Sequence, residues 1–233
     1  MVAVTLAASL FHHEVGTAWA TIAGADGVQK CLRYPEDRQE GLNYLDAGAK
    51  EGTEVRLGND KISVELRWRR GRWILESFRN EASGQKLVVG KPVLTVWDKA
   101  KRPVSDLERD TMPSISIEQN AVKGGPDGVR YGVVVKLSRF RSCDDVQRAA
   151  AATFFLGDGE NQIEELVLAM AYSFGDPTED LGRIDAGLPK TGGKGFSFAA
   201  EAIDGASPTY GEGRVSFPQD NIAGRGKIVW RVL

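Results

Sequence analysis

Hydrophobic and polar residues alternate along much of the chain, most clearly between Leu57 and Val88. In the segment 62–68, apolar residues take every second position, which is the period of a half-buried β-strand. Arg70-Gly71 predicts a tight turn, because glycine reaches positive φ without steric cost. Residues 73–78 then predict the returning strand. This stretch therefore predicts a β-hairpin followed by a loop.

Further short apolar runs follow the hairpin, each bounded by turn-forming Pro, Gly, Asp or Asn residues. The segments expected to be strands are 93–97, 115–117, 129–137, 152–156, 162–174, 196–202, 213–217 and 227–232. A series of roughly ten strands at close spacing favours an antiparallel β-sandwich over a βαβ arrangement. We therefore predict an all-β fold, a large antiparallel supersandwich of two sheets packed face to face, with few short helices.

Other segments are less regular. The Ala-rich segment 144–152 predicts one or two helical turns. Residues 164–171 also suit a helix by propensity, but a turn cluster precedes them and we expect a strand. The Gly- and Pro-containing segment 175–195 predicts a long loop. Residues 1–54 are expected to be an irregular lead-in with room for first strands, and 55–233 to be the supersandwich domain.

The amino terminus carries a signal-like pattern within residues 1–20. Val2–Phe11 is apolar, and Ala18-Trp19-Ala20 has the small-x-small form of a cleavage site. No positive residue precedes the run, so an ordinary first strand or a frayed leader is favoured over a signal peptide, and the run is too short to span a bilayer. The compartment stays open between secreted, periplasmic and cytoplasmic.

The overall charge argues against two classes of partner. The 233 residues include 30 basic and 32 acidic ones, a formal charge of −2. We therefore expect no nucleic-acid partner and no attraction to an anionic membrane. The basic hairpin tip 67–73 is the one local exception, but Trp68 shares the parity of the apolar residues and should pack in the core. Arg67 and Arg69 then lie on the outer face beside Glu65, where ion pairing or solvation is sufficient to explain them.

Residue types that supply nucleophiles, bases and metal ligands are scarce. Cys31 and Cys143 cannot form a disulfide framework, and we expect buried free thiols, with their pairing left open. His12 and His13 are adjacent, so on a strand they would point to opposite faces. Neither belongs to a triad or to a metal-ligand spacing. The sequence thus predicts no catalytic histidine, no metal and no cofactor.

Carboxylate pairs and glycine-rich segments offer weaker signals. Acidic neighbours on a strand cannot both face one substrate, and acidic pairs on surfaces are mostly solvated. The pairs are Glu164 and Glu165, Asp144 and Asp145, Asp158 and Glu160, and Glu179 and Asp180. The run Gly192-Gly193-Lys194-Gly195 lacks the spacing of a phosphate-binding loop. We assign no catalytic residue from these patterns.

Exposed tryptophan is the remaining candidate for ligand binding, because a flat aromatic ring stacks on the apolar face of a sugar. Core packing is the commoner role of any single tryptophan. Trp73 lies beside the predicted turn and Trp97 at a predicted strand end, so we expect these two to be partly exposed. With Arg72 and Asp98 as hydroxyl partners, they form the predicted carbohydrate-binding residues.

Several motifs resemble one known fold family. They are N-D-x-I-S-V-x-L at Asn59–Leu66, G-R-W-x-L-x-S-F-x-N at Gly71–Asn80, A-S-G-Q-x-L at Ala82–Leu87 and the passage Thr153–Ala171. This pattern is similar to the opening hairpin and a later strand-turn-strand motif of galactose-mutarotase-like supersandwich domains. Such domains occur as sugar epimerases, as non-catalytic amino-terminal domains of glycoside hydrolases and in polysaccharide lyases.

The chain departs from the catalytic branches of that family. The epimerases use a histidine within the sheet, and no histidine follows His13. In the hydrolases, the resemblance places the catalytic carboxylates in a separate downstream barrel, and this chain stops at Leu233 without a barrel pattern, as expected of an accessory domain or of a fragment of a longer protein. We therefore expect a non-catalytic carbohydrate-recognition or accessory domain, partnered by a catalytic domain. The alternatives are a lyase or glycoside hydrolase that uses Asp and Glu in a cleft, and a structural domain that packs against a partner.

Overall fold

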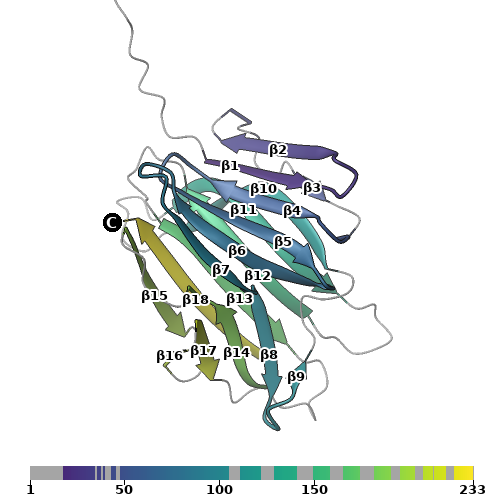
Figure 1. Cartoon of the computed structure of the whole chain (residues 1–233), viewed down its shortest axis with the longest axis vertical. Coiled ribbons are helices and arrows are strands. Elements are labelled where there is room, and N and C mark those ends of the chain that lie inside the picture. The colour runs from purple at the N-terminus through teal and green to yellow at the C-terminus, as the bar shows by residue number, and fades with distance from the viewer. Residues whose placement is uncertain are drawn as a thin grey trace, which may run out of the picture.

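Antiparallel strands make up the regular structure of this chain (Figure 1). The computed structural model describes residues 18–34, 36–37, 39, 43–45, 48–104, 111–121, 129–140, 149–157, 165–173, 181–189, 195–202, 207–211, 213–218 and 223–232. Within these residues there are three sheets and no helix, so the predicted all-β class is confirmed. None of the described residues forms a helix long and apolar enough to cross a membrane.

Sheet A has six strands in the order β2-β1-β4-β5-β6-β7. Its strands are β1 (Ala18–Ala23), β2 (Gln29–Tyr34), β4 (Glu54–Gly58), β5 (Ile62–Arg69), β6 (Arg72–Asn80) and β7 (Lys86–Pro92). In β5 the buried and partly exposed positions alternate, as the sequence pattern predicted. The first two strands come from the segment expected to be a lead-in, and they extend this sheet at one edge.

Sheet B has seven strands in the order β15-β18-β13-β12-β11-β10-β3. Its strands are β3 (Asn43–Leu45), β10 (Met112–Ala121), β11 (Val129–Phe140), β12 (Ala149–Gly157), β13 (Glu165–Ser173), β15 (Phe196–Ala202) and β18 (Ala223–Val232). The expected strand over 164–171 is confirmed by β13. The expected helix over 144–152 is wrong for its last four residues, because they belong to β12 and pair with β11 on one side and β13 on the other.

Sheet C is a third, five-stranded sheet in the order β16-β17-β14-β8-β9. Its strands are β8 (Leu94–Asp98), β9 (Pro103–Val104), β14 (Leu181–Gly187), β16 (Thr209–Gly211) and β17 (Arg214–Pro218). β7 of sheet A ends at Pro92 and β8 begins two residues later, so the chain passes almost directly from sheet A into sheet C. Sheet C lies at the lower end of the molecule in Figure 1. The sequence did not predict this sheet. Its central strand β14 lies within the segment 175–195, which we expected to be a loop.

The core lies between sheets A and B, whose strands β1, β2 and β4 contact β10, β11 and β12. Phe78 of sheet A and Trp230 of sheet B are both fully buried, and their ring centroids lie 3.9 Å apart. Burial of each such side chain stabilises the fold by about 1.5–3 kcal/mol relative to exposure. The predicted pair of facing sheets therefore corresponds to A and B.

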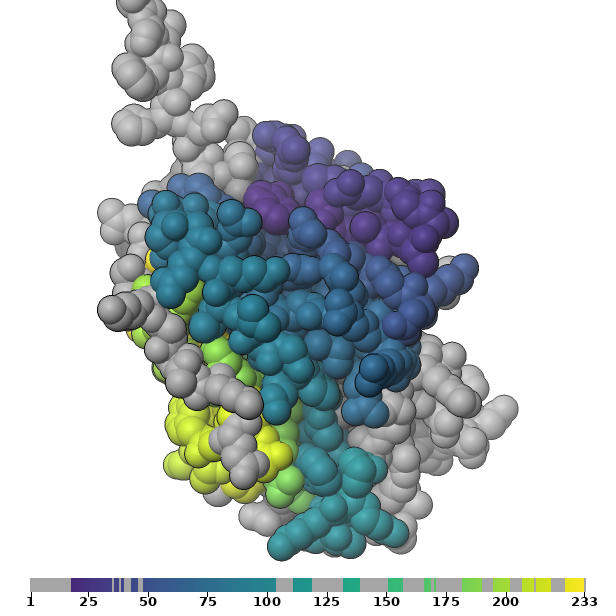
Figure 2. Space-filling view, in the orientation of Figure 1, coloured from purple at the N-terminus to yellow at the C-terminus, as the bar shows by residue number. Residues whose placement is uncertain are grey.

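The predicted hairpin is confirmed in β5 and β6. Arg70 and Gly71 form its turn with φ of 51° and 77°, the two positive values of a type I′ turn. Trp68 is in the core with an exposed fraction of 7%, as predicted. On the outer face, Arg67 Nη2 lies 2.9 Å from Glu65 Oε1, so of the two expected environments, ion pairing or solvation, Arg67 has the first. Strands β4 to β7 face the viewer in blue and teal in Figure 2.

One further expectation is wrong, and others lie outside the described residues. Cys31 is a free thiol but is exposed, because the neighbouring Leu32 takes the inward position on β2. Residues 1–17, with His12 and His13, and Cys143 lie outside the described part of the chain. The same holds for at least one member of each predicted carboxylate pair.

Candidate functional site

The hairpin tip does not provide the predicted tryptophan surface. Trp73 is 1% exposed, so its expected partial exposure is wrong. The reason is the hairpin register, which pairs Trp73 directly with Trp68. Residues directly opposite each other in an antiparallel pair share one face, so the inward direction of Trp68 carries Trp73 into the core. Their rings meet edge to face with centroids 5.6 Å apart, and Arg72 is left exposed beside them.

Trp97, in contrast, is partly exposed, as the sequence predicted. Asp98 is the next residue and serves the turn that follows β8. Its Oδ1 accepts a hydrogen bond from the backbone N–H of Arg102, and its Oδ2 accepts one from Arg102 Nε, both at 2.7 Å. The backbone hydrogen bond from Arg102, with its guanidinium charge, holds the pKa of Asp98 below its usual range. Of the four predicted residues, Trp97 is thus the one that lies among the polar side chains on the outer face of sheet C.

The outer face of sheet C carries Trp97 among polar side chains. The strand register pairs Trp97 with Arg183, and Asp185 with Thr95 on one side and Ser216 on the other. Because directly paired residues lie on one face, these five side chains share it. The intervening residues of the same strands are buried on the opposite face: Val96, Ile184, Ala186, Val215 and Phe217. We call the polar side the sheet C face.

Asp185 is the centre of the sheet C face. It is 5% exposed, and its Oδ2 accepts a hydrogen bond of 2.8 Å from the indole N–H of Trp97. Arg183 Nε lies 3.2 Å from Oδ1, and Arg214 Nη1 lies 3.8 Å from Oδ2. A buried carboxylate is costly unless it is paired and hydrogen-bonded. Oδ2 fulfils this condition, because it also accepts a hydrogen bond of 3.3 Å from Arg183 Nε, whereas Oδ1 is buried without a hydrogen-bond partner among the described residues and has only the charge of Arg183 beside it. Asp185 therefore orients the indole and the Arg183 guanidinium through hydrogen bonds, and its charge attracts Arg214 at a longer distance.

The Trp97 ring is also held from above its plane. The guanidinium carbon of Arg183 lies 4.6 Å from the ring centroid, within the range of a cation–π contact. Together with the indole hydrogen bond, this contact fixes the ring orientation on a solvent-facing sheet. An aromatic side chain that is fixed before a ligand arrives loses little conformational entropy on binding.

A cavity of about 200 Å³ opens beside the indole. Its lining includes Thr95, Trp97, Asp185 and Arg214 from sheet C, and Lys91 from the end of β7. The lining also includes Gly187, where an added Cβ would lie 2.8 Å from both Lys91 Cβ and the carbonyl oxygen of Pro92. A glycine is thus needed for β7 and β14 to approach so closely. The hollow combines an aromatic wall, a hydroxyl and two cationic groups around one buried acid.

Arg183, Asp185 and Arg214 were missed by sequence reasoning. A signal for the first two was present, because Ile184, Ala186 and Leu188 alternate with them and are buried. That alternation covers a short stretch between Gly- and Pro-rich flanks, which favoured the interpretation of a loop. Arg214 lies on a strand that was expected, but nothing local places it beside Trp97.

Neither a metal site nor a known relative indicates what the sheet C face does. Among the described residues, no group of three or more His, Cys, Asp or Glu side chains could hold a metal ion. The chain matches no family model, and no curated protein or solved structure matches it significantly. The function must therefore be inferred from the arrangement of the side chains.

Proposed function

We propose that this chain is a non-catalytic carbohydrate-recognition or accessory domain of a carbohydrate-active enzyme, and that the sheet C face binds the sugar. The observation that carries the proposal is Trp97, a partly exposed indole fixed by Asp185 and Arg183 at the edge of a polar cavity. Its apolar ring can stack on the C–H face of a sugar ring. Specific small-molecule sites commonly combine such an apolar wall with a few placed polar groups.

The polar groups of the cavity suit sugar hydroxyls. Arg214 and Lys91 offer N–H donors, and the Thr95 hydroxyl both donates and accepts. An apolar cavity of about 150 Å³ holds a benzene molecule, so about 200 Å³ has room for one six-membered ring. The cavity therefore suits one sugar unit, with the rest of an oligosaccharide lying across the open sheet.

The acid content of the cavity favours recognition over hydrolysis. Glycoside hydrolysis ordinarily needs two carboxyl groups about 5–10 Å apart on either side of the bond. Among the described residues that line the cavity, Asp185 is the acidic one, and its Oδ2 already accepts hydrogen bonds from Trp97 and Arg183. The motif resemblance to accessory supersandwich domains points in the same direction, with a catalytic domain as the expected partner.

Isothermal titration calorimetry of the full chain tests the proposal, with a broad panel of neutral and acidic oligosaccharides as ligands. At least one sugar should give saturable heat, and Trp97→Ala should weaken its binding at least tenfold. Arg214→Gln removes a cavity donor without removing the indole and should also weaken binding. The control is Arg102→Gln, an exposed arginine of the β8–β9 turn that does not line the cavity. A panel without any saturable response, or equal binding by wild type and Trp97→Ala, would overturn the proposal.

A further inference from the structure

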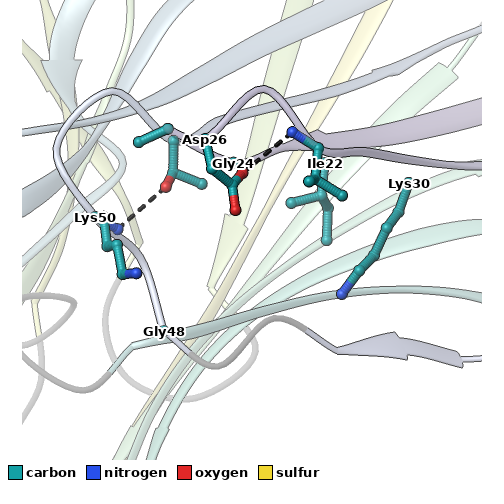
Figure 3. A pocket seen from close by; sticks show the side chains of 9 residues that line it. Ile22, Gly24, Asp26, Lys30, Gly48 and Lys50 are labelled. Atoms are coloured by element: carbon teal, nitrogen blue, oxygen red, sulfur yellow. Dashed lines mark hydrogen bonds between the residues drawn. The ribbon is translucent and has the colours of Figure 1, made fainter.

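A second pocket lies at the edge of sheet A, beside β1 and β2, and shares no residue with the proposed sugar site (Figure 3). It has a volume of about 190 Å³ and lies between the turn that joins β1 to β2 and the segment 48–53 that leads into β4. Its wall combines the apolar side chains of Ile22 and Val28 with four polar residues. These polar residues are Asp26, Lys30, Lys50 and Thr53.

The carboxylate of Asp26 is held in place by its own turn. Its Oδ1 accepts a hydrogen bond of 3.1 Å from the backbone N–H of Val28. The same oxygen lies 2.5 Å from where a Cβ at Gly24 would be, so the exposed carboxylate keeps this position only while residue 24 has no side chain. This arrangement leaves Oδ2 to accept a hydrogen bond from a ligand. In Figure 3 the carboxylate lies between the side chains of Lys50 and Lys30.

The two ammonium groups reach the pocket from different segments. Lys30 Nζ donates a hydrogen bond of 2.8 Å to the carbonyl oxygen of Leu45, which leaves further N–H groups of that ammonium to donate. The backbone of Lys50 is fixed because its N–H donates to Thr53 Oγ1 at 3.1 Å. Thr53 is 2% exposed, and because its oxygen accepts that bond, its hydroxyl hydrogen can be donated. The pocket thus presents two positive charges, one negative charge and a hydroxyl.

We propose that this pocket binds a small hydroxy acid. The ligand carboxylate would lie between the ammonium groups of Lys30 and Lys50, and a ligand hydroxyl would donate to Asp26 Oδ2. The excess of one positive charge favours an anion, whereas Asp26 disfavours a compact dianion such as phosphate and favours a ligand that also carries a hydrogen-bond donor. The volume suits a ligand of about six carbon atoms, since about 150 Å³ holds a benzene.

Three probes of one chain length separate the parts of this proposal. Gluconate carries a carboxylate and hydroxyls, hexanoate carries the carboxylate alone, and sorbitol carries hydroxyls alone. The full chain is titrated with each probe, and backbone amide chemical shifts measure the binding. Gluconate should bind at least tenfold more tightly than hexanoate or sorbitol. The shifts should be largest at residues 24–30 and 48–53. Hexanoate or inorganic phosphate binding as tightly as gluconate would overturn the need for a hydroxyl donor.

Charge removal tests the two lysines. Lys50→Gln should weaken gluconate binding at least tenfold, and Lys30→Gln should do the same. Because Lys30 also contacts Leu45, Lys50→Gln is the decisive variant. Lys136→Gln removes the same charge from an exposed position on sheet B and should leave binding unchanged. Equal gluconate affinity of wild type and Lys50→Gln would overturn the proposal. The amide shifts of residues 24–30 and 48–53 report on this pocket, and those of sheet C report on the sugar site, so failure here and failure of the sugar site are distinguishable.

Discussion

The indole N–H of Trp97 donates a 2.8 Å hydrogen bond to Oδ2 of Asp185, joining two strands whose residues lie 88 positions apart in the sequence. The two residues are diagonal neighbours in the register of β8 and β14, because Trp97 pairs with Arg183 and Asp185 with Thr95. The contact has two consequences. It supplies a donor to a carboxylate that is 5% exposed, and it sets the direction in which the indole ring faces solvent.

Trp97→Phe should destabilise the protein through the loss of this donor. Phenylalanine keeps an aromatic ring but leaves Asp185 Oδ2 with only the longer, 3.3 Å hydrogen bond from Arg183 Nε. A buried polar group that loses a partner costs about 1–3 kcal/mol, and we expect a loss toward the lower end of that range. The free energy of unfolding in urea measures the effect. Trp19→Phe is a matched control, because Trp19 is also partly exposed and lies in a strand of sheet A. An equal loss in both variants would mean that ring volume, not the hydrogen bond, accounts for the change.

Gly226→Ala should destabilise the packing of sheet C on sheet B. A Cβ at Gly226 of β18 would lie 2.8 Å from Cδ1 of Phe217, a fully buried residue of β17. Forcing an added carbon into a packed core typically costs about 1–3 kcal/mol. Thermal or urea unfolding measures this cost. Gly211→Ala, on the exposed strand β16, meets no atom within 4 Å and should change stability far less.

The hairpin could be predicted from the sequence because its determinants are local. Alternation over residues 62–68 sets the inward face, and Arg70-Gly71 sets the turn. The same local rules also determine that the Trp73 side chain faces the core. A two-residue turn places it opposite Trp68, so the inward face of one fixes the face of the other. Its predicted exposure failed because proximity to a turn was given more weight than register.

Sheet C could not be predicted in the same way. Its central strand β14 pairs with β8 and β17, and the first of these pairings spans a long sequence separation with a register shift between Leu181 and Arg183. Propensity and alternation do not specify which distant strands pair. Trp97 could therefore be identified as a candidate, whereas Asp185 and Arg214 become its neighbours only through the tertiary fold.

The type I′ turn of the β5–β6 hairpin predicts opposite effects at its two central positions. Gly71→Ala should destabilise the protein by about 1–2 kcal/mol, because a residue with a Cβ at φ of 77° is strained. Arg70→Asn should instead stabilise it by a few tenths of a kcal/mol, since asparagine tolerates positive φ better than arginine. Urea unfolding of both variants measures the difference. A stabilising Gly71→Ala would contradict the observed turn geometry.

Glu65 on the outer face of sheet A should contribute to the acid sensitivity of the fold. Burial alone would raise its pKa, but the hydrogen bond from Lys86, with the charges of Lys86, Arg56 and Arg67, holds that pKa below its usual range. A carboxyl with a lower pKa in the folded state binds protons less readily there than in the unfolded chain. Its stabilisation is therefore complete above the unfolded glutamate pKa of about 4.3, and is lost as the pH falls through the lower folded value.

Lys86→Gln tests this origin of the Glu65 shift. Lys86 Nζ lies 3.3 Å from Glu65 Oε2, so its removal should raise the pKa of Glu65, as measured by carboxyl carbon chemical shifts during a pH titration. Glu65→Gln should correspondingly flatten the fall in unfolding free energy below about pH 4.3. Lys136→Gln removes one positive charge from the other large sheet and controls for the change in net charge. If Lys136→Gln raised the Glu65 pKa as much as Lys86→Gln, the change in net charge would account for the shift, and the direct contact with Lys86 would not be its cause.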